Sequence, residues 1–477
     1  MGNGSEQLRT VAVRGLVIVR EVRDRVLRRR LTRASRRGDP RRTARLLQRS
    51  SLDIRSGLGR LDGRRVRRPL PSVAVLARSQ FTDDARALAG LLDAERVLLI
   101  SREALKAIAA PHLPPDAGDL TYRIAAARDN APMLRYRAFL ADVWRHLDPD
   151  GDVRLVLTAN SGYWAEVELG GALEELGVPF VALHKENLKS PAHAAEWRRV
   201  YREERATFHG RRILVQNEGE RALQAGGEVA PADRIEVVGL ARLDAFHAHR
   251  ARTAGELPTG DIVFAGFLPG AILPRPHGYV GTDPVHGLPL PDVDHRPEHF
   301  VEACLALHRV AIAVARRLPS RRIVVKTKGG DHDRNWFPRV LDIAADGAAL
   351  PTNLRLVHGG DAAAMTRSAA VLAGLNTTML LEALAAGRPA VALVLAEAAG
   401  EASEHVVDLS GAAQVVHDET AAIDLIVRLA EHPPAVPAAL DAATEAVLER
   451  WTGNPDGAAT QRTISALRRA IGRPESA

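Results

Sequence analysis

The sequence predicts an α/β protein with two doubly wound domains. Short runs of Val, Ile, Leu and Ala alternate with helical patterns from about residue 71 onward. The alternation pauses near residue 255, in the stretch ARTAGELPTG, and then restarts. Continuous apolar runs joined by helices are typical of parallel strands covered on both faces. Two successive series therefore indicate two such domains with a cleft between them.

Length and composition agree with a soluble globular protein. The chain has 477 residues, which is too long for one ordinary core, and 46% of them are hydrophobic and 26% charged. No apolar stretch reaches 18 residues, so neither a spanning helix nor an ordinary signal peptide is expected. The single cysteine, Cys304, lies in an apolar helical pattern. It excludes a disulfide framework and a thiolate metal site and favours a cytoplasmic location.

The first 70 residues read as a separate basic extension. They contain 21 Arg, no Lys and six acidic residues, a net charge of +15 against +7 for the whole chain. Residues 9–31 form a basic amphipathic helical pattern, followed by an arginine-rich polar connector up to Pro69. The helix could pack on the protein or a partner, or attach to an anionic membrane surface on the inner face of the cell membrane. Nucleic acid is disfavoured because the segment has no aromatic side chain to stack bases.

The strands and domains follow from the apolar runs. Residues 71–255 form the first predicted domain, 256–435 the second, and 436–477 a pair of C-terminal helices. A Pro- and Gly-rich stretch, 268–297, interrupts the second domain after its first strand and is expected as a loop at the mouth of the cleft. The predicted strands are 73–77, 96–100, 153–158, 178–183, 212–216 and 235–238, then 262–265, 322–326, 354–357, 370–373, 390–394 and 413–416.

One helix of the second domain carries a solitary carboxylate. In VLAGLNTTMLLEALAAGRPAVALV, residues 371–394, a strand ends at Gly374 and a helix opens at Asn376, Thr377 and Thr378. A helix beginning at the carboxyl end of a parallel strand suits a phosphate group. Glu382 lies one turn after Thr378, and vicinal sugar hydroxyls would offset the cost of burying it. The alternative is a capped core helix whose Glu382 reaches solvent or an arginine.

This stretch resembles the signature of GT-B-type transferases, especially the bacterial group with capsule-polysaccharide and CDP-glycerol glycerophosphotransferases. More distantly it is similar to UDP-N-acetylglucosamine 2-epimerases. The resemblance implies the GT-B fold, in which two Rossmann-like domains face each other across a cleft and the second binds the nucleotide donor. It also implies that Thr377 and Thr378, with Asn376 before them, bind the donor diphosphate and that Glu382 binds the ribose.

A second motif lies before the interdomain boundary. The segment 211–244 ends in GLARLD and is similar to the same group's GxPRxD pattern, with Gly239, Arg242 and Asp244 matching and Ala241 in place of Pro. Gly239 would allow close backbone approach, and Arg242 would bind a phosphate oxygen or position Asp244. All three are therefore predicted at the donor site. The alternative is a structural Arg–Asp pair at the hinge.

A third motif places a cation at a strand end. In RRIVVKTKGGDHD, residues 321–333, Lys326 matches the lysine of the family's KxHP pattern, while Lys328 stands where the histidine is expected. Lys326 is predicted to lie near the donor diphosphate, and the alternative is a surface lysine. His332 follows four residues later and could replace the missing imidazole.

Polar residues that follow two strands of the first domain point to the acceptor. The strand 178–183 is followed by His184, Lys185 and Glu186, and an HKE triplet resembles members of the same group. His184 is the expected general base, with Glu186 as the next candidate, and a purely binding or structural role for both is the alternative. Lys185 is expected to bind the acceptor. Asn160 and Ser161 follow the preceding strand and are expected there too.

No metal site or cofactor fingerprint is present in the sequence. The stretch DHDRN at residue 331 has no second carboxylate pair to support it, and neither a G-x-G-x-x-G nor a Walker A pattern occurs. The resemblance implies a metal-independent enzyme without cofactor, with a nucleotide-activated donor as substrate.

The sequence thus predicts a glycosyltransferase of surface polysaccharide biosynthesis that acts on a glycan or lipid-linked acceptor. The alternatives are a CDP-polyol phosphotransferase of teichoic-acid type, an enzyme like UDP-N-acetylglucosamine 2-epimerase, and a non-catalytic GT-B binding protein. The favoured hypothesis predicts that Glu382→Ala removes donor binding and leaves thermal stability nearly unchanged.

Overall fold

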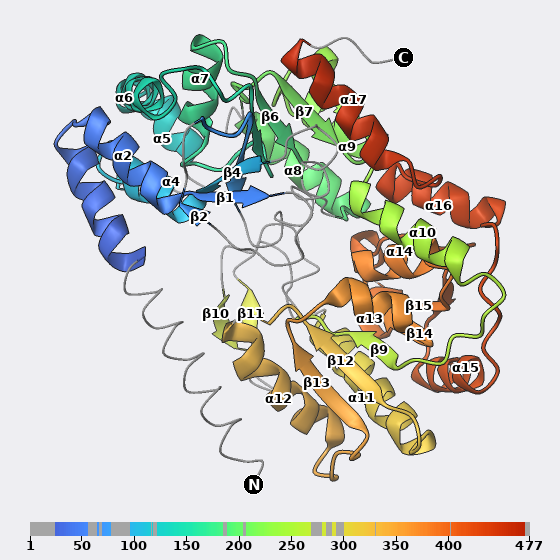
Figure 1. Ribbon diagram of the computed structural model, residues 1–477. Coiled ribbons are helices and arrows are strands. Elements are labelled where there is room, and N and C mark those ends of the chain that lie inside the picture. The colour runs from blue at the N-terminus through green and yellow to red at the C-terminus, as the bar shows by residue number, and fades with distance from the viewer. Residues whose placement is uncertain are drawn as a thin grey trace, which may run out of the picture.

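The protein, seen here as a computed structural model, consists of two α/β domains (Figure 1). The second domain follows the first in the chain, and the last helices return to the first. The described residues are 24–55, 64–65, 69–77, 96–115, 117, 122–184, 188–203, 207–268, 279–282, 289–291, 300–329, 331–400 and 402–472.

The first domain is built on a sheet of order β2-β1-β4-β3-β5-β6-β7-β8. Six of its strands, from β4 to β8, are parallel, while β1 and β2 join one edge antiparallel. From β3, the next strands along the chain are added first on one side, β4, and then on the other side, β5 to β8. The strand order therefore reverses between β3 and β5. The strands are β1 (Leu52–Arg55), β2 (Arg64–Arg65), β3 (Val73–Ala77), β4 (Arg96–Ser101), β5 (Leu155–Thr158), β6 (Phe180–Leu183), β7 (Arg212–Val215) and β8 (Ile235–Val237).

The second domain has the strand order of a Rossmann fold. Its six-stranded parallel sheet runs β13-β12-β9-β14-β15-β16, which in chain order within the domain is 3-2-1-4-5-6. The order reverses between β9 and β14. The strands are β9 (Ile262–Ala265), β12 (Ile323–Thr327), β13 (Leu354–His358), β14 (Val371–Gly374), β15 (Ala390–Leu393) and β16 (Gln414–Val416).

The predicted fold class is confirmed. Each apolar run expected to be a strand contains one, and all of them are in the parallel parts of the two sheets. The reason is visible in β9 and β14, whose four residues each are all buried, as two-sided cover by helices requires. This is the two-domain layout that the GT-B resemblance implied.

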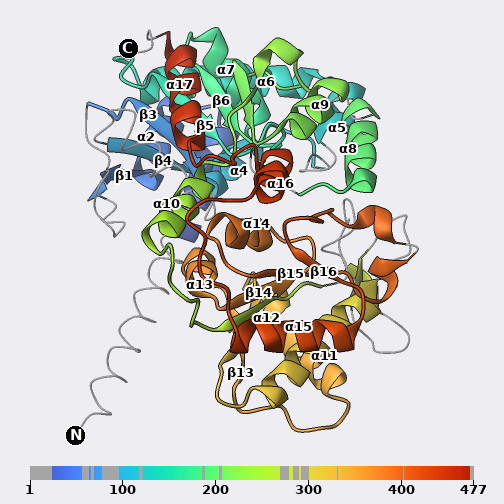
Figure 2. The same ribbon diagram turned by 90° about the vertical axis from the view of Figure 1, so that its right-hand side faces the viewer.

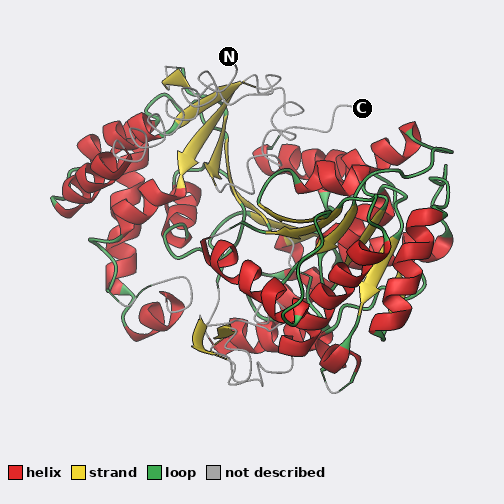
Figure 3. Cartoon of the chain, turned by 90° about the horizontal axis from the view of Figure 1, so that it is seen from below, coloured by secondary structure: helices red, strands yellow, loops and turns green. Residues whose placement is uncertain are grey.

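Helices pack on both faces of the first sheet. Figure 3 shows the strands of the protein with helices around them. One face packs on helices that follow the strands and on two helices of the N-terminal segment. The other face packs on α17, the last helix of the chain. The helices are α2 (Pro40–Ser50), α4 (Arg102–Ala109), α5 (Tyr122–Arg128), α6 (Ala131–Leu147), α7 (Val167–Glu175), α8 (Pro191–Glu203), α9 (Glu218–Gly226), η1 (Ala232–Arg234) and α17 (Ala459–Ile471).

The second sheet is covered in the same way. One face packs on α11, α12 and α15, and the other on α10, α14 and α16. The elements are η2 (Ala241–Leu243), α10 (Asp244–Arg252), α11 (Val301–Arg317), α12 (Asp331–Ala345), α13 (Ala362–Ser368), α14 (Thr378–Ala385), η5 (Ala396–Ala399), η6 (Ser403–His405), α15 (Glu419–Glu431) and α16 (Ala442–Thr452). Helix α10 precedes the predicted boundary at residue 255 but packs on α14 of the second domain.

The N-terminal segment is part of the first domain from residue 24 onward. A helix of residues 24–36 and then α2 bury Leu31 and Leu47 in the core of that domain, and β1 pairs with β4. The expected polar connector is therefore wrong. Its arginines lie on the exposed side of α2, while the opposite side is buried, so the helix is amphipathic despite its composition. Residues 1–23, with most of the predicted helix, lie outside the described residues.

The C-terminal helices connect the two domains (Figure 2). Helix α16 packs against α14 in the second domain and also contacts α9 of the first. Helix α17 then lies on the first sheet, where Ile464 and Leu467 are buried against β3, β5 and β7. The two helices expected for this region are thus present, and they fix the domains to each other.

The Pro- and Gly-rich stretch 268–297 contains two short strands in its described part. They are β10 (Tyr279–Thr282) and β11 (Pro289–Pro291), which pair antiparallel. The rest of the predicted loop lies outside the described residues.

Candidate functional site

The loop after β14 occupies the point where the strand order of the second sheet reverses. Strands β14 and β9 are neighbours there, and Gly374 pairs in register with Ala265. A Cβ on Gly374 would lie 3.0 Å from the Ala265 side chain, so there is little room for a larger residue between these two strands. Ligands of open α/β sheets bind outside the carboxyl ends of the strands at such a reversal. The motif identified in the sequence is therefore at the expected position.

Helix α14 begins directly after this loop. Thr377 is its N-cap, and its Oγ1 accepts a hydrogen bond from the Met379 backbone N–H at 3.3 Å. Thr378 is the first helical residue, and both threonines are partly exposed. The first turn offers backbone N–H groups and the positive end of the helix dipole, which suit an anionic group.

Asn376 has a structural role in this loop. Its φ of +47° is in the left-handed region, which asparagine tolerates better than most residues. Its Nδ2 donates to the His405 carbonyl at 2.6 Å, and its Oδ1 accepts from the Val407 N–H at 2.8 Å. These contacts join the loop to η6 and explain Asn376 without a ligand. Its donor-binding role remains a prediction.

Glu382 is paired with an arginine. The side chain is 6% exposed, and its Oε1 lies 3.0 Å from the Nε of Arg242 in η2. The sequence suggests that Glu382 has no protein partner and that sugar hydroxyls offset its burial. This needs correction, because the structure shows the alternative, in which an arginine is the partner. The pair joins two of the three predicted donor motifs. It also means that Glu382→Ala should not leave stability unchanged.

Gly239 and Asp244 contact the C-terminal segment. Gly239 has a φ of +81° and packs against the backbone of Gly453. The Asp244 carboxylate accepts hydrogen bonds from the Ala459 N–H at 3.2 Å and the Thr460 N–H at 2.8 Å, at the start of α17. A hinge pair between Arg242 and Asp244 is therefore not what the structure shows, since each side chain has other partners. These contacts explain Gly239 and Asp244 without a donor.

Replacing Gly239 by alanine is expected to destabilise the protein by roughly 2–5 kcal/mol. The new Cβ would lie 2.4 Å from the Gly453 carbonyl oxygen, in addition to the cost of a positive φ. Gly255 is the matched control, because its φ is +84° and nothing lies within 4 Å of a Cβ there. Urea denaturation of both variants measures the difference. Equal losses for the two would show that the close approach to Gly453 costs nothing.

Lys326 lies near the end of β12, on the other side of β9 from β14. It pairs in register with Ala265, which in turn pairs with Gly374, so the three residues form a row across neighbouring strands. Two strand spacings separate Lys326 from the loop, about 10 Å. The side chain is buried, which excludes the surface-lysine alternative, and its Nζ donates to the Thr327 carbonyl. Lys328 is exposed, and the side chain of His332 lies outside the described residues.

The acceptor residues expected after β5 are at the reversal point of the first sheet. Asn160 and Ser161 follow the end of β5, the strand next to β3. The Asn160 Oδ1 accepts from the Gly162 N–H at 2.9 Å, a local turn, and Ser161 is buried. Their position fits a ligand site at this edge, and acceptor binding itself remains a prediction.

His184 follows directly on β6 and is almost completely buried. Its backbone N–H donates to the Leu214 carbonyl at 2.8 Å, which extends the pairing with β7. Its Nε2 lies 3.1 Å from Oε1 of Glu220, and the two side chains are 4% and 3% exposed. Lys185 and Glu186 lie outside the described residues, so their predicted roles are not addressed by the structure.

A buried polar cluster around Glu220 is the feature that sequence reasoning missed. Lys189 Nζ forms an ion pair with Oε2 of Glu220, and Gln224 Nε2 donates to Oε1 at 2.9 Å. Burial alone would raise the pKa of Glu220, but Lys189 and His184 together hold it below its usual range. In the sequence Glu220 is three residues after the N-cap Asn217, where an acid reads as part of a helix cap. Because this position fits a helix cap, nothing in the sequence pointed to Glu220 as the buried partner of His184.

A second contact missed from the sequence joins the two domains. His193 in α8 and His405 in η6 meet edge to face, with ring centroids 6.4 Å apart. The Ser190 hydroxyl lies 3.0 Å from Nδ1 of His193, and Asn376 holds the backbone of His405. The donor-motif loop is thereby connected to the first domain.

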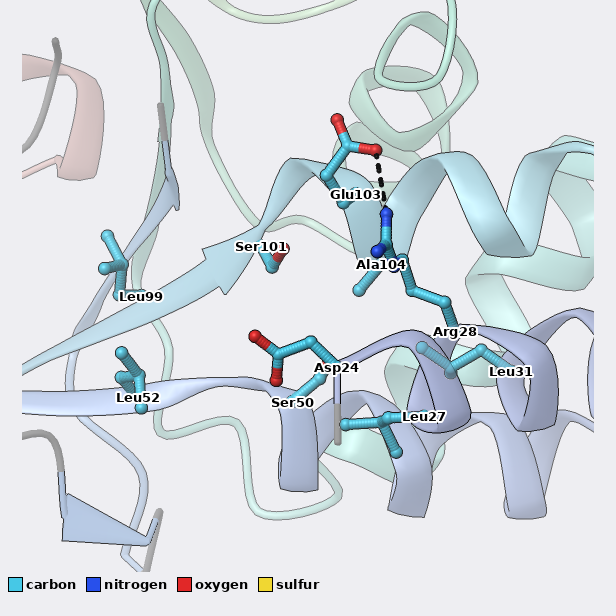
Figure 4. Close-up of a pocket in the computed structure, with 10 residues that line it drawn as sticks. All are labelled: Asp24, Leu27, Arg28, Leu31, Ser50, Leu52, Leu99, Ser101, Glu103 and Ala104. Atoms are coloured by element: carbon cyan, nitrogen blue, oxygen red, sulfur yellow. Dashed lines mark ion pairs between the residues drawn. The ribbon is translucent and has the colours of Figure 1, made fainter. Parts of the chain in front are cut away.

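The first domain also contains a cavity of about 310 Å³ between the N-terminal helix and the end of β4 (Figure 4). Leu27, Leu31, Leu52, Leu99 and Ala104 supply its apolar lining. An ion pair between Arg28 and Glu103, 3.7 Å apart, lies beside it. None of the residues predicted for the donor or acceptor site lines this cavity.

The described part of the chain contains neither a metal-ion cluster nor a membrane-spanning helix. Its residues include no cluster of three or more His, Cys, Asp or Glu side chains arranged to hold a metal ion. Among the helices described, none has the length and apolar character needed to cross a bilayer.

Comparison with known proteins finds similarity in backbone only. No protein-family model matches the chain, and no curated protein matches its sequence. UDP-GlcNAc 2-epimerase from Neisseria meningitidis, bound to UDP-GlcNAc, is 12% identical, with a TM-score of 0.43 over 83% of this chain and 99% of that one. HepE from Anabaena, in complex with UDP and glucose, is 13% identical, with a TM-score of 0.44 over 84% and 99%.

The wall teichoic acid polymerase TagF is 10% identical, with a TM-score of 0.40 over 69% of this chain and 76% of that one. Similarity at these levels establishes neither the family nor the activity of the chain. The sheet order and the contacts described above are therefore the basis for assigning a function.

Proposed function

We propose that the protein is a glycosyltransferase that moves a sugar from a nucleotide-activated donor to a hydroxyl of a glycan or lipid-linked acceptor. The observation that carries the proposal is the position of the loop 374–378. It lies where the strand order of a Rossmann-type sheet reverses and leads directly into the capped N-terminus of α14. That position is where such sheets bind nucleotides.

The donor diphosphate would lie at the N-terminus of α14. Its charge suits the helix dipole and the free N–H groups of the first turn, and Thr378 can add a hydroxyl donor. Lys326 would supply positive charge from the row of residues across β12, β9 and β14. As the diphosphate leaves, these groups stabilise its growing negative charge. A ribose contact with Glu382 requires the sugar to share this carboxylate with Arg242.

The acceptor hydroxyl would be bound by the first domain, with His184 as its general base. An imidazole can take a proton from a hydroxyl near neutral pH. His184 is at the carboxyl end of β6, the edge where Asn160 and Ser161 follow β5. His184 and these two residues would then lie at the same edge of the sheet.

A thermal-shift screen against UDP-, CDP-, GDP- and CMP-linked compounds tests donor binding, because a ligand of the native state raises the melting temperature. Thr378→Val is expected to reduce the shift, since it removes the hydroxyl and keeps the side-chain shape. Thr420→Val is the matched control, because Thr420 is exposed in the first turn of α15, after the edge strand β16. No shift with any of the four donor classes would overturn the proposal.

Product analysis separates the reaction classes that share this site. A UDP-sugar converted to its epimer without acceptor would identify a 2-epimerase. Transfer of a polyol phosphate from a CDP-linked donor would identify a phosphotransferase. Binding without turnover of any donor in the presence of glycan acceptors would identify a non-catalytic protein. Only sugar transfer to a hydroxyl supports the favoured reaction.

Contact with an anionic membrane is proposed for the N-terminal segment. The helix of residues 24–36 buries one side and exposes arginines, including Arg25, Arg29 and Arg33, on the other. Salt-sensitive sedimentation with phosphatidylglycerol vesicles is expected for the full chain and should weaken when Arg25, Arg29 and Arg33 are replaced by Gln, a change that leaves the buried side of the helix intact. Deletion of residues 1–70 would not be a clean control, because it removes part of the first core, including Leu31 and Leu47. Equal sedimentation in about 50 mM and about 500 mM salt would contradict an electrostatic attachment.

A further inference from the structure

The two ring nitrogens of His184 have very different surroundings. Nε2 lies 3.1 Å from the Glu220 carboxylate. Nδ1 is buried, and no residue in the described part of the chain forms a hydrogen bond with it. Buried ring nitrogens are normally satisfied, although one nitrogen each of His247 and His308 also lacks a partner among the described residues. What distinguishes His184 is that it follows directly on β6, at the edge where sheets of this type bind ligands, so its free nitrogen points to a ligand.

Glu220 determines which nitrogen carries the proton of the neutral ring. Lys189 and Gln224 both donate to this carboxylate, and the Lys189 ammonium keeps its pKa below the usual range despite burial. An ionised carboxylate can only accept hydrogen bonds. The proton must therefore be on Nε2, and Nδ1 keeps its lone pair.

We infer that Glu220 is a positioning residue, which holds His184 in the Nε2–H tautomer so that Nδ1 accepts the proton of the acceptor hydroxyl. This inference rests on the proposed function. In the step it describes, the acceptor O–H bond breaks and its proton moves to Nδ1. The oxygen forms a bond to the anomeric carbon, and the bond from that carbon to the diphosphate breaks. The nucleoside diphosphate leaves with the electron pair.

The isosteric change Glu220→Gln should invert the tautomer. Lys189 can only donate, so the new amide would turn its oxygen to Lys189 and its NH₂ toward His184 and Gln224. Gln224 can adapt by turning its own amide, because its Oε1 has no hydrogen-bond partner among the described residues. Nε2 of His184 must then accept, the proton moves to Nδ1, and the base is lost.

Glu218→Gln provides the matched control. It makes the same change two residues earlier on α9, at an exposed side chain whose partner is Arg221 on the surface. A purely electrostatic or folding effect of removing one carboxylate from this helix would occur in both variants. Only the change at Glu220 should alter His184.

The experiment is ¹⁵N NMR of the histidine rings in the full-length protein, with the His184 signals assigned from their loss in His184→Gln. The Nε2–H tautomer is expected for the wild type and for Glu218→Gln, and the Nδ1–H tautomer for Glu220→Gln. With the donor found in the thermal-shift screen, the kcat of Glu220→Gln should be about 100-fold lower than that of the wild type. The KM for the donor should change little.

An Nδ1–H tautomer in the wild type would overturn the inference, and this spectrum decides it even if Glu220→Gln does not fold. An inverted tautomer in Glu220→Gln with unchanged kcat would also overturn it, because Nδ1 would then not be the base. If the wild type turns over no nucleotide-sugar, the proposed function fails, and the spectrum still shows whether Glu220 positions the ring.

Discussion

Glu382→Ala is expected to lower the free energy of unfolding by about 3 kcal/mol, the lower end of the range for breaking a buried ion pair. The variant leaves Arg242 without the carboxylate 3.0 Å from its Nε. Because the Arg242 side chain is 24% exposed, water can solvate part of its charge, which keeps the loss at the lower end. Urea denaturation, followed by the transition of the second domain, measures the effect.

Glu419→Ala is the matched control for this prediction. Glu419 pairs with Arg309 at 2.7 Å in the same domain, but both side chains are more than one-third exposed. Removing that carboxylate should cost less than about 1 kcal/mol, as for other surface pairs. A similar loss in both variants would mean that burial of the Arg242–Glu382 pair adds nothing.

A double-mutant cycle with Arg242→Ala separates the pair from the two side chains. If the pair is the source of the loss, the double variant should be more stable than the sum of the single losses predicts, because no buried charge is left alone. Additive losses would contradict this. Donor-induced thermal shifts of Glu382→Gln then test the ribose role separately, since this change keeps the volume of the side chain.

The sheets could be predicted because each strand carries its signal locally. In β9 and β14 four consecutive apolar residues are enough to identify a strand buried on both faces. The short antiparallel strand β1, Leu52–Arg55, which lies between β2 and β4, could not be identified in this way, because two of its four residues are charged. Helix α2 was missed although Leu46 and Leu47 show its buried side, because four arginines within eleven residues resemble a polar linker.

The site was predictable only as far as its motifs are local. The loop 374–378 and its helix were recognised from capping residues and a strand end within one short stretch. The partner of Glu382 is 140 residues away in the chain, and the partner of His184 is on the next helix but one. Nothing in the local sequence specifies such pairs, because they depend on how the strands are ordered and how η2 and α9 pack.

Lys189→Met is expected to destabilise the first domain by roughly 3–5 kcal/mol at pH 7. The Lys189 and Glu220 side chains are 8% and 3% exposed, so removing the ammonium leaves a buried carboxylate whose side-chain partners among the described residues are His184 and Gln224. Lys106→Met is the matched control, because Lys106 pairs with Glu103 at 3.3 Å on the surface of α4. That change should cost less than about 1 kcal/mol.

The pH dependence of the loss identifies its cause. In the wild type the pKa of Glu220 is held below its unfolded value of about 4.3, so its contribution is fully present above that pH and is lost as the pH falls below it. Without Lys189, burial should dominate and raise the folded pKa above the unfolded value. The carboxylate then destabilises the variant at neutral pH, and this penalty disappears as the pH falls and the group takes up its proton.

The difference in unfolding free energy between wild type and Lys189→Met should therefore shrink from about pH 7 to about pH 4. Adding Glu220→Gln should restore much of the loss at about pH 7. A gap that is constant over this range would show that the loss comes from packing of the lysine stem rather than from the buried charge.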